Sequence, residues 1–238
     1  LNDIYKRVGE FPWKDAQNMS GWEYGTNLNY LKSISKYWIS KYNWKKFENK
    51  INSFKNYKTK VEDINLHFIF EKSKNPNSRP LLLLHGWPGS ISEFLNIIPR
   101  LAHPEKYGGK IEDGFDVIVP SLPGFGFSSQ IKKALGPRKI GKILNKFMVK
   151  NLGYKNYFVQ GGDWGATIAG WIGLDSSKNC KGIHINCLPL RHPKGPKNSK
   201  EKKWEKKFNF DQIMQEGYRT QQATKPQTCL LYTSDAAD

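Results

Sequence analysis

The sequence predicts an α/β fold built around a mostly parallel β-sheet. Short apolar segments bounded by turn residues recur along residues 61–188, and segments of helical length and pattern separate them. Strands that alternate with helices in this way form βα units whose strands lie parallel. The length of 238 residues suits one large domain or two small ones.

Residues 1–60 are polar and aromatic, and their pattern predicts helix. Between Leu28 and Phe47 the apolar residues fall mostly three to five positions apart, which aligns them on one helical face. We therefore expect a helix over this range, with Trp38 and Trp44 as core or packing residues. The apolar residues are Leu28, Leu31, Ile34, Trp38, Tyr42 and Phe47.

Beyond Lys60 the pattern becomes that of strands. Residues 64–70 largely alternate between apolar and polar, as in a half-buried strand. Continuous apolar segments favour strands that are buried on both faces of a parallel sheet. The segments of this kind are 80–84, 115–119, 157–160 and 181–188, and the helices expected are 90–101, 140–152, 166–174 and 208–221.

The charge and the cysteines exclude several classes of protein. There are 38 basic and 21 acidic residues, a net charge of +17, and 32 of the basic residues are Lys. Recognition of nucleic acid favours Arg, so a solvated lysine surface is the simplest interpretation. A surface near anionic lipid headgroups is the second, and we expect no nucleic-acid partner. Three cysteines without a C-x-x-C pair indicate neither a disulfide framework nor zinc. We expect no metal and no cofactor.

A G-x-D-x-G turn follows the predicted strand at 157–160. It runs Gly161-Gly162-Asp163-Trp164-Gly165. The same pattern with a central Ser forms a nucleophile elbow, where glycines flank the nucleophile because the turn has no room for side chains. The start of a helix favours an ionised carboxylate, and a carboxylate can attack carbon to form an ester. The alternative is an ordinary helix-capping Asp.

A second loop, HGWPGS at residues 85–90, follows the predicted strand at 80–84. Its His-Gly pair resembles the loop that supplies one oxyanion-hole N–H in α/β-hydrolases, and the second N–H there would come from Trp164. The alternative is an ordinary βα turn. Both loops lie at the carboxyl ends of buried strands, where open parallel sheets place their sites. The candidate loop residues are His85, Gly86, Pro88, Gly162 and Gly165. The glycine- and aromatic-rich loop 120–128 is expected beside them.

No histidine has the position expected of a general base. In an α/β-hydrolase the base comes last in chain order, after the nucleophile and the acid. His184 falls inside a predicted strand, and His192 lies at the start of the segment that follows. We therefore interpret all five histidines as structural, with His85 as a candidate part of the oxyanion loop. They are His67, His85, His103, His184 and His192.

Three motifs in this order and spacing resemble the microsomal epoxide hydrolases, including the juvenile hormone epoxide hydrolases of insects. They are HGWPGS at 85–90, VPSLPGFGFS at 119–128 and VQGGDWG at 159–165. Residues 24–70 are similar to that family's own N-terminal domain. The segment GYRTQQATKP at 217–226 resembles the family's lid. The resemblance implies an α/β-hydrolase fold preceded by a helical N-terminal domain.

The resemblance also implies a role for individual residues. Asp163 is the nucleophile that opens a small apolar epoxide and becomes an ester, which is hydrolysed to release a vicinal diol. The backbone N–H groups of Trp87 and Trp164 stabilise the oxyanion of that hydrolysis. Tyr218 matches the lid tyrosine that hydrogen-bonds the epoxide oxygen and protonates the leaving alkoxide, which is a poor leaving group without a proton.

The sequence departs from the family at Cys229, and we interpret 229–238 as a non-native tail on a truncated chain. The expected division is 1–60 for the N-terminal domain, 61–190 for the first half of the hydrolase core, and 191–228 for the start of the lid. The acid and the catalytic His would lie further on, so we expect at most ester formation. An uncovered sheet edge would also make the chain poorly soluble.

Two alternatives to an epoxide hydrolase remain at this level. A haloalkane dehalogenase also uses an Asp nucleophile followed by Trp, and a non-catalytic relative of the fold could act as a binding protein. The family carries a membrane anchor upstream of its N-terminal domain. The resemblance therefore implies a location at the endoplasmic reticulum membrane, in detoxification or in juvenile hormone catabolism. The particular epoxide is left open.

Overall fold

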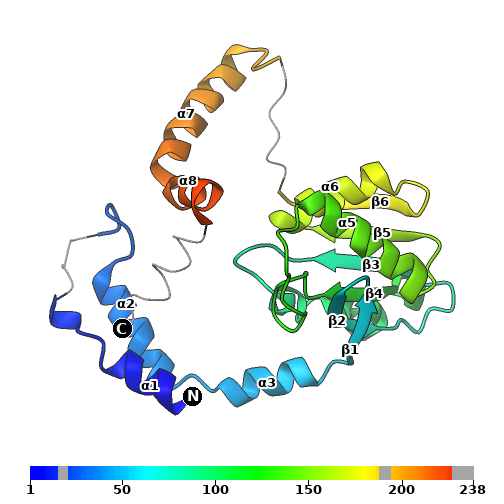
Figure 1. Ribbon diagram of the computed structural model, residues 1–238, viewed down its shortest axis with the longest axis horizontal. Coiled ribbons are helices and arrows are strands. Elements are labelled where there is room, and N and C mark those ends of the chain that lie inside the picture. Colours follow the sequence, from blue (N-terminus) through cyan, green and yellow to red (C-terminus); the bar gives the residue numbers. More distant parts are fainter. Residues whose placement is uncertain (16–20, 188–193, 227–238) are drawn as a thin grey trace. The chain divides into compact units, whose positions relative to one another are not determined.

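The computed structural model describes residues 1–15, 21–187 and 194–226 (Figure 1). The chain divides into two compact units, Leu1–Leu188 and Pro189–Asp238. His192 and the interpreted tail at 229–238 lie outside the described residues.

A six-stranded sheet forms the centre of the first unit among the residues described. Its strand order is β1-β2-β4-β3-β5-β6. The strands β3, β4, β5 and β6 pair in parallel, whereas β1 and β2 pair antiparallel, as do β2 and β4. The mostly parallel sheet is therefore confirmed. The strands are β1 Asn56–Val61, β2 Ile64–Glu71, β3 Arg79–Leu84, β4 Phe115–Pro120, β5 Tyr157–Gly161 and β6 Cys180–Ile185.

Helices cover both faces of this sheet. The central strand β3 is therefore buried on both of its faces, which explains its continuous apolar sequence. Leu82 and Leu84 face one core, which α5 and α6 cover. Leu83 faces the other core, which α3, α4 and the short helix Ile91–Phe94 cover. Because both faces of the strand are buried, alternation between polar and apolar residues disappears. The helices of this unit are α1 Asn2–Gly9, α2 Leu28–Ser40, α3 Trp44–Asn52, α4 Ile98–Ala102, α5 Pro137–Lys146 and α6 Trp164–Asp175.

The expected helix from Leu28 to Phe47 is wrong in extent, because the structure has two helices there. The first, α2, ends at Ser40, and α3 begins at Trp44. Asn43 starts the second helix, since its side chain accepts a hydrogen bond from the backbone N–H of Lys46. A capping Asn competes with helix continuation because it satisfies a backbone donor locally.

Two predictions of burial are also wrong. Trp38 and Trp44 are 42% and 39% exposed, so neither is a core residue, although Trp44 does pack against the ring of Phe47, with centroids 5.6 Å apart. The strand β6 is not buried on both faces: only Cys180 of its six residues is buried, and among the described strands β6 pairs with β5 alone. The predicted helix at 90–101 is instead two short helices, Ile91–Phe94 and α4.

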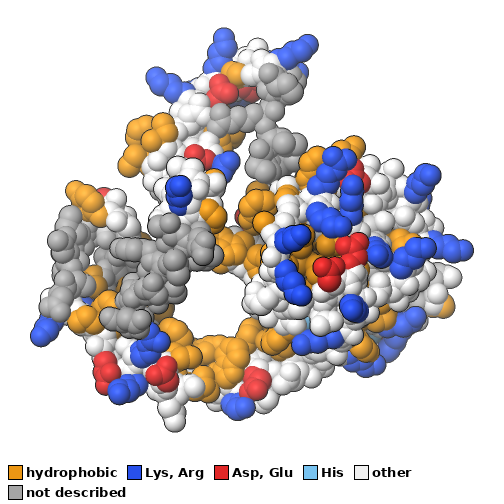
Figure 2. All heavy atoms as spheres, viewed as in Figure 1, with side chains coloured by type: hydrophobic (Ala, Val, Ile, Leu, Met, Phe, Trp, Pro, Cys, Tyr) orange, Lys and Arg blue, Asp and Glu red, His pale blue; other side chains and the backbone are white. Residues whose placement is uncertain are grey.

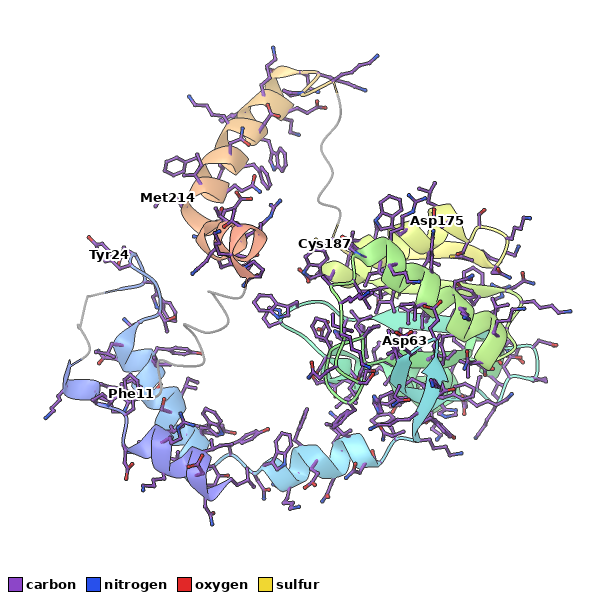
Figure 3. All side chains as sticks on the ribbon, viewed as in Figure 1. Phe11, Tyr24, Asp63, Asp175, Cys187 and Met214 are labelled. Carbon is purple, nitrogen blue, oxygen red and sulfur yellow. The ribbon has the colours of Figure 1, made fainter. Side chains whose placement is uncertain are left out.

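The second unit contains α7, Ser199–Gln215, and α8, Gly217–Thr224. Asn198 caps α7 by accepting from the backbone N–H of Glu201, and the Glu201 carboxylate in turn accepts from the Asn198 amide. The predicted helix at 208–221 therefore begins earlier than expected and is interrupted at Glu216. The exposed Met214 near the end of α7 is labelled in Figure 3. No helix among the residues described is both long and apolar enough to cross a membrane.

Candidate active site

The turn between β5 and α6 holds Asp163 in an unusual backbone conformation. Its φ is +50° and its ψ is −124°, and it is one of two non-glycine residues with positive φ among the described residues. Such a conformation costs about 1–3 kcal/mol and persists where the surrounding structure enforces it. The residue occupies the position before α6, so its carboxylate lies at the positive end of the helix. The turn is therefore an elbow that presents a carboxylate.

Glycines surround the elbow because the backbones there approach too closely for side chains. A Cβ on Gly161 would lie 2.1 Å from the carbonyl oxygen of Gly165. A Cβ on Gly165 would lie 2.1 Å from the carbonyl oxygen of Leu84 at the end of β3. On Gly86 it would lie 2.4 Å from the Cβ of Asp163. The glycines thus bring the loop after β3 against the loop after β5.

The two predicted loops meet at Asp163. The backbone N–H of Trp87 donates a hydrogen bond to Oδ1 of Asp163, with 2.8 Å between the two heavy atoms. Trp164 is the first residue of α6, and N–H groups in the first turn of a helix have no partner within it. The Trp164 side chain is 51% exposed, and Pro88 follows a cis Trp87–Pro88 peptide bond. One carboxylate oxygen thus already accepts from the expected N–H donor.

His85 joins this loop to the loop at 120–128. Its Nε2 accepts from the backbone N–H of Leu122 at 3.0 Å, and its Nδ1 donates to the carbonyl oxygen of Gly86 at 2.9 Å. Its ring also meets the ring of Phe125 edge to face, with centroids 5.3 Å apart. Burial lowers the pKa of His85, and the Gly86 carbonyl and Glu93 oppose that shift. The loop at 120–128 therefore lies against the loop at 85–90.

A second histidine, His67, also holds the loop at 120–128 in place. His67 on β2 is buried, and its Nδ1 lies 2.9 Å from Oγ of Ser121. Its Nε2 lies 3.0 Å from Oδ1 of Asn56. The Ser128 hydroxyl donates to the carbonyl oxygen of Ser121 at 2.7 Å. Burial, and then the charge of Lys58, lower the pKa of His67 to about 4.

The other predicted residues lie at separate places. His103 pairs with Glu71 at 2.8 Å, and His184 is on β6. Tyr218 is on α8 in the second unit, where its side chain is 61% exposed. Among the described residues no three side chains are grouped as a metal site would need.

Asn186 is a residue near the elbow that the sequence reasoning missed. It follows β6, and its side-chain oxygen would lie 2.6 Å from a Cβ on Gly162. Its position at the carboxyl end of a parallel strand is a signal that could have found it. Figure 3 shows the neighbouring exposed Cys187 at this end of the strand.

The strained backbone of Asp163 after β5, the glycine contacts and the loop after β3 together form the elbow of an α/β-hydrolase fold. The chain belongs to the α/β hydrolase fold family, whose model matches residues 79–230. Within that family the relationship is with epoxide hydrolases, because residues 1–94 match the model for the epoxide hydrolase N terminus.

Two curated relatives carry the same relationship. Epoxide hydrolase 1 of Oryctolagus cuniculus is 39% identical over 198 residues, which are 81% of this chain and 43% of that protein. Juvenile hormone epoxide hydrolase 1 of Ctenocephalides felis is 34% identical over 227 residues, or 87% of this chain and 48% of that protein. The chain thus spans about half the length of the curated relatives it matches.

Solved structures agree with this assignment. The juvenile hormone epoxide hydrolase of the silkworm Bombyx mori superposes with a TM-score of 0.82 at 30% identity, covering 95% of this chain and 57% of the silkworm chain. The epoxide hydrolase of Aspergillus niger gives a TM-score of 0.81 at 28% identity, covering 95% of this chain and 60% of that one. The predicted fold and the resemblance to epoxide hydrolases are confirmed.

Proposed function

We propose that this chain carries the nucleophilic half of an epoxide hydrolase site. The observation that supports this most directly is the geometry of Asp163, a carboxylate on a strained elbow with one oxygen held by the Trp87 N–H at 2.8 Å. That hydrogen bond fixes Oδ1 and leaves Oδ2 as the attacking atom. A fixed nucleophile needs little reorganisation before it attacks.

The proposed first step is a displacement at carbon. Oδ2 of Asp163 forms a bond to one epoxide carbon, the ring C–O bond breaks, and its electron pair becomes an alkoxide. Tyr218 donates the proton that makes this alkoxide a hydroxyl group. The product is a hydroxyalkyl ester of Asp163, and relief of ring strain drives its formation. A proton donor is needed because an alkoxide is a poor leaving group.

The second step returns the carboxylate. Water attacks the ester carbonyl, negative charge gathers on the carbonyl oxygen, and the backbone N–H groups of Trp87 and Trp164 stabilise it. Donors of this kind contribute about 2.7–4 kcal/mol to such a step. The attacking water also needs a general base. We assign this role to none of the five histidines of this chain, so the chain itself is proposed to stop at the ester.

We propose the domain division expected from the sequence, with boundaries near residues 60, 190 and 228. The match of residues 1–94 to the epoxide hydrolase N terminus supports a separate N-terminal region. The change of compact unit between Leu188 and Pro189 supports the boundary near 190. The substrate class proposed is a small apolar epoxide, and the site uses no cofactor, metal or nucleic acid.

We also propose that the N-terminal helices rest on an anionic membrane of the endoplasmic reticulum type. An apolar cavity of about 670 Å³ is lined from α1 to α3 by side chains that include Ile4, Ile34, Tyr37 and Trp38. Nine Lys and one Glu occupy residues 32–60. Figure 2 shows blue basic side chains and orange apolar ones on the described surface. Aromatic side chains with nearby lysines favour the interface of an anionic bilayer.

Mass spectrometry of the intact protein tests the first step. We expect styrene oxide to add its own mass once, and peptide mapping to place the adduct on Asp163. The Asp163→Asn variant keeps an oxygen acceptor for the Trp87 N–H and is expected to form no adduct. Release of bromide from 1-bromobutane without an epoxide adduct would favour the haloalkane dehalogenase alternative. Binding without either reaction would favour the non-catalytic binding protein.

Co-sedimentation with vesicles tests the membrane proposal. We expect binding to phosphatidylserine vesicles, loss of binding to pure phosphatidylcholine, and several-fold weaker binding for Trp38→Ser. The exposed Trp204 of α7 provides the matched control, since Trp204→Ser should bind as the parent chain does. Equal binding to both vesicle types would contradict the proposal, as would equal binding by the two variants.

A further inference from the structure

The peptide group between Gly86 and Trp87 is hydrogen-bonded at both of its ends. Its carbonyl oxygen, on Gly86, accepts from Nδ1 of His85 at 2.9 Å. Its N–H, on Trp87, donates to Oδ1 of Asp163 at 2.8 Å. A single peptide plane therefore connects the imidazole to the carboxylate. Because hydrogen bonds in a chain polarise one another, the bond at the carbonyl strengthens the N–H as a donor.

The partners of His85 fix which nitrogen carries its proton. Leu122 presents a backbone N–H, which can only donate, so Nε2 must accept. Nδ1 faces a carbonyl oxygen, which can only accept, so Nδ1 must carry the hydrogen. A second proton on Nε2 would point at the Leu122 N–H, and the side chain is 0% exposed. The arrangement therefore requires a neutral ring.

We propose that His85 is a positioning residue that orients the Trp87 N–H toward Asp163 through the Gly86 carbonyl. The proposal rests on the proposed function, in which that N–H serves the nucleophile and its ester. In this role the imidazole acts through the peptide group and not on the substrate directly. It acts by holding the peptide plane in the one orientation that aims the N–H at Oδ1.

The loop that carries Leu122 gives the imidazole a firm support. Ser121 is hydrogen-bonded to His67, whose other nitrogen bonds Asn56 on β1. The hydrogen bonds therefore run from the β1–β2 hairpin through this loop to His85 and on to the elbow. Among charged groups, Glu93 acts to raise the pKa of His85. Burial lowers this pKa by more, so the net shift is downward.

Two substitutions test the roles of the two ring nitrogens of His85 one at a time. In His85→Asn the side-chain amide nitrogen takes the place of Nδ1, so the donor to Gly86 is kept and the acceptor for Leu122 is lost. In His85→Gln the side-chain end takes the place of Nε2, so an acceptor for Leu122 is kept and the donor to Gly86 is lost. The proposal predicts that Asn rescues the site and that Gln does not.

The direct measurement is the chemical shift of the Trp87 backbone amide proton. Protein labelled with ¹⁵N-tryptophan gives this signal, and Trp87→Phe assigns it by its disappearance. We expect the parent chain and His85→Asn to share a downfield shift, and His85→Gln to move upfield. This readout needs no substrate, so it tests the positioning role even if the proposed function fails. The other tryptophan amides report whether each variant is folded.

The chemical readout is the rate of ester formation with styrene oxide. We expect His85→Gln to lower this rate by about ten-fold or more and His85→Asn to recover most of the loss, since removal of one such donor costs up to about 10²–10³. His103→Gln is the control, because His103 pairs with Glu71 away from the elbow, and it should react as the parent does. If none of these proteins formed an ester but the predicted amide shifts were present, the proposed function would be overturned and the positioning role of His85 would stand.

Two results would overturn the positioning role. One is an unchanged Trp87 amide shift in His85→Gln, or an equal shift in both variants. The other needs no substitution at all: ¹⁵N-histidine spectra of the parent chain at neutral pH should show His85 protonated on Nδ1. A ring protonated on Nε2, or on both nitrogens, contradicts the hydrogen bonds on which the proposal stands, even if the variants fail to fold.

Discussion

The elbow and the N-terminal helices are both rich in tryptophan and both marked by the sequence, yet they are organised differently. At the elbow, glycines and backbone hydrogen bonds hold Asp163 in a strained conformation with its neighbours in contact. Along α1 to α3, large apolar side chains such as Trp38 and Tyr37 are 42% and 52% exposed around an open cavity. The elbow thus has its packing partners within the described residues, and the helices expose an apolar face.

This difference teaches which residues should tolerate change. A side chain added where backbones touch forces the chain apart, whereas a side chain removed from an exposed face loses few contacts. Substitutions in the two regions should therefore differ in their effect on stability.

Gly165→Ala should give the largest loss of stability. The new Cβ would lie 2.1 Å from the carbonyl oxygen of Leu84, and neither backbone can move without opening the elbow. We expect the free energy of unfolding to fall by more than about 3 kcal/mol, measured by urea denaturation followed by circular dichroism.

Gly170→Ala on the same helix is the matched control. Nothing lies within 4 Å of a Cβ at Gly170, and Ala favours helix over Gly by about 0.5–1 kcal/mol. It should therefore raise stability slightly. If the two substitutions changed stability equally, close backbone contact would not be the reason that Gly165 is required at the elbow.

The second prediction concerns the pH dependence of stability at His67. Its folded pKa of about 4 lies below the unfolded value of 6.5, so the unfolded chain binds more protons between these values. His67 therefore stabilises the fold fully above about pH 6.5, and this contribution is lost as the pH falls toward 4. From the shift, the loss is on the order of 3 kcal/mol.

In His67→Gln the side chain at position 67 no longer titrates, while the other titratable groups are kept. Urea denaturation of both proteins between pH 4 and 7 should give a smaller dependence on pH for the variant. His184→Gln, on the exposed strand β6, should keep the dependence of the parent chain. Identical curves for the parent chain and His67→Gln would contradict the neutral, buried ring.

The smallest effect is expected on the exposed helical face. Trp38→Ser should change the free energy of unfolding by less than about 1 kcal/mol, because Trp38 is outside the buried core and is 42% exposed. Urea denaturation followed by circular dichroism measures this. A loss above about 2 kcal/mol would mean that Trp38 is buried in the folded protein, and would remove the contrast with the elbow.

The elbow could be predicted from the sequence because its constraints are local. Gly161, Asp163 and Gly165 are neighbours in the chain, and the tight turn itself demands the glycines. The apolar run at 81–84 likewise indicated a strand buried on both faces. The positions of both loops after buried strands then placed them at one edge of the sheet.

Other features could not be predicted because they depend on distant partners. The bond between His85 and Leu122 joins residues 37 positions apart, and that between His67 and Ser121 joins residues 54 apart. The exposure of Trp38 depends on what packs against α2, and helical spacing carries no information about this. The pattern of β6 resembled a buried strand, although only Cys180 of its six residues is buried and, among the described strands, it pairs with β5 alone.

The sequence by itself determined the alternation of strands and helices, the elbow and the family, because each is written in local spacing or in motifs. The tertiary structure alone decided that the Trp87 N–H meets Oδ1 of Asp163 and that His85 holds the same peptide group from its other end. The physical reason is that hydrogen bonds have short range and strict direction. Their partners are fixed only once the carboxyl ends of β3, β4 and β5 lie side by side.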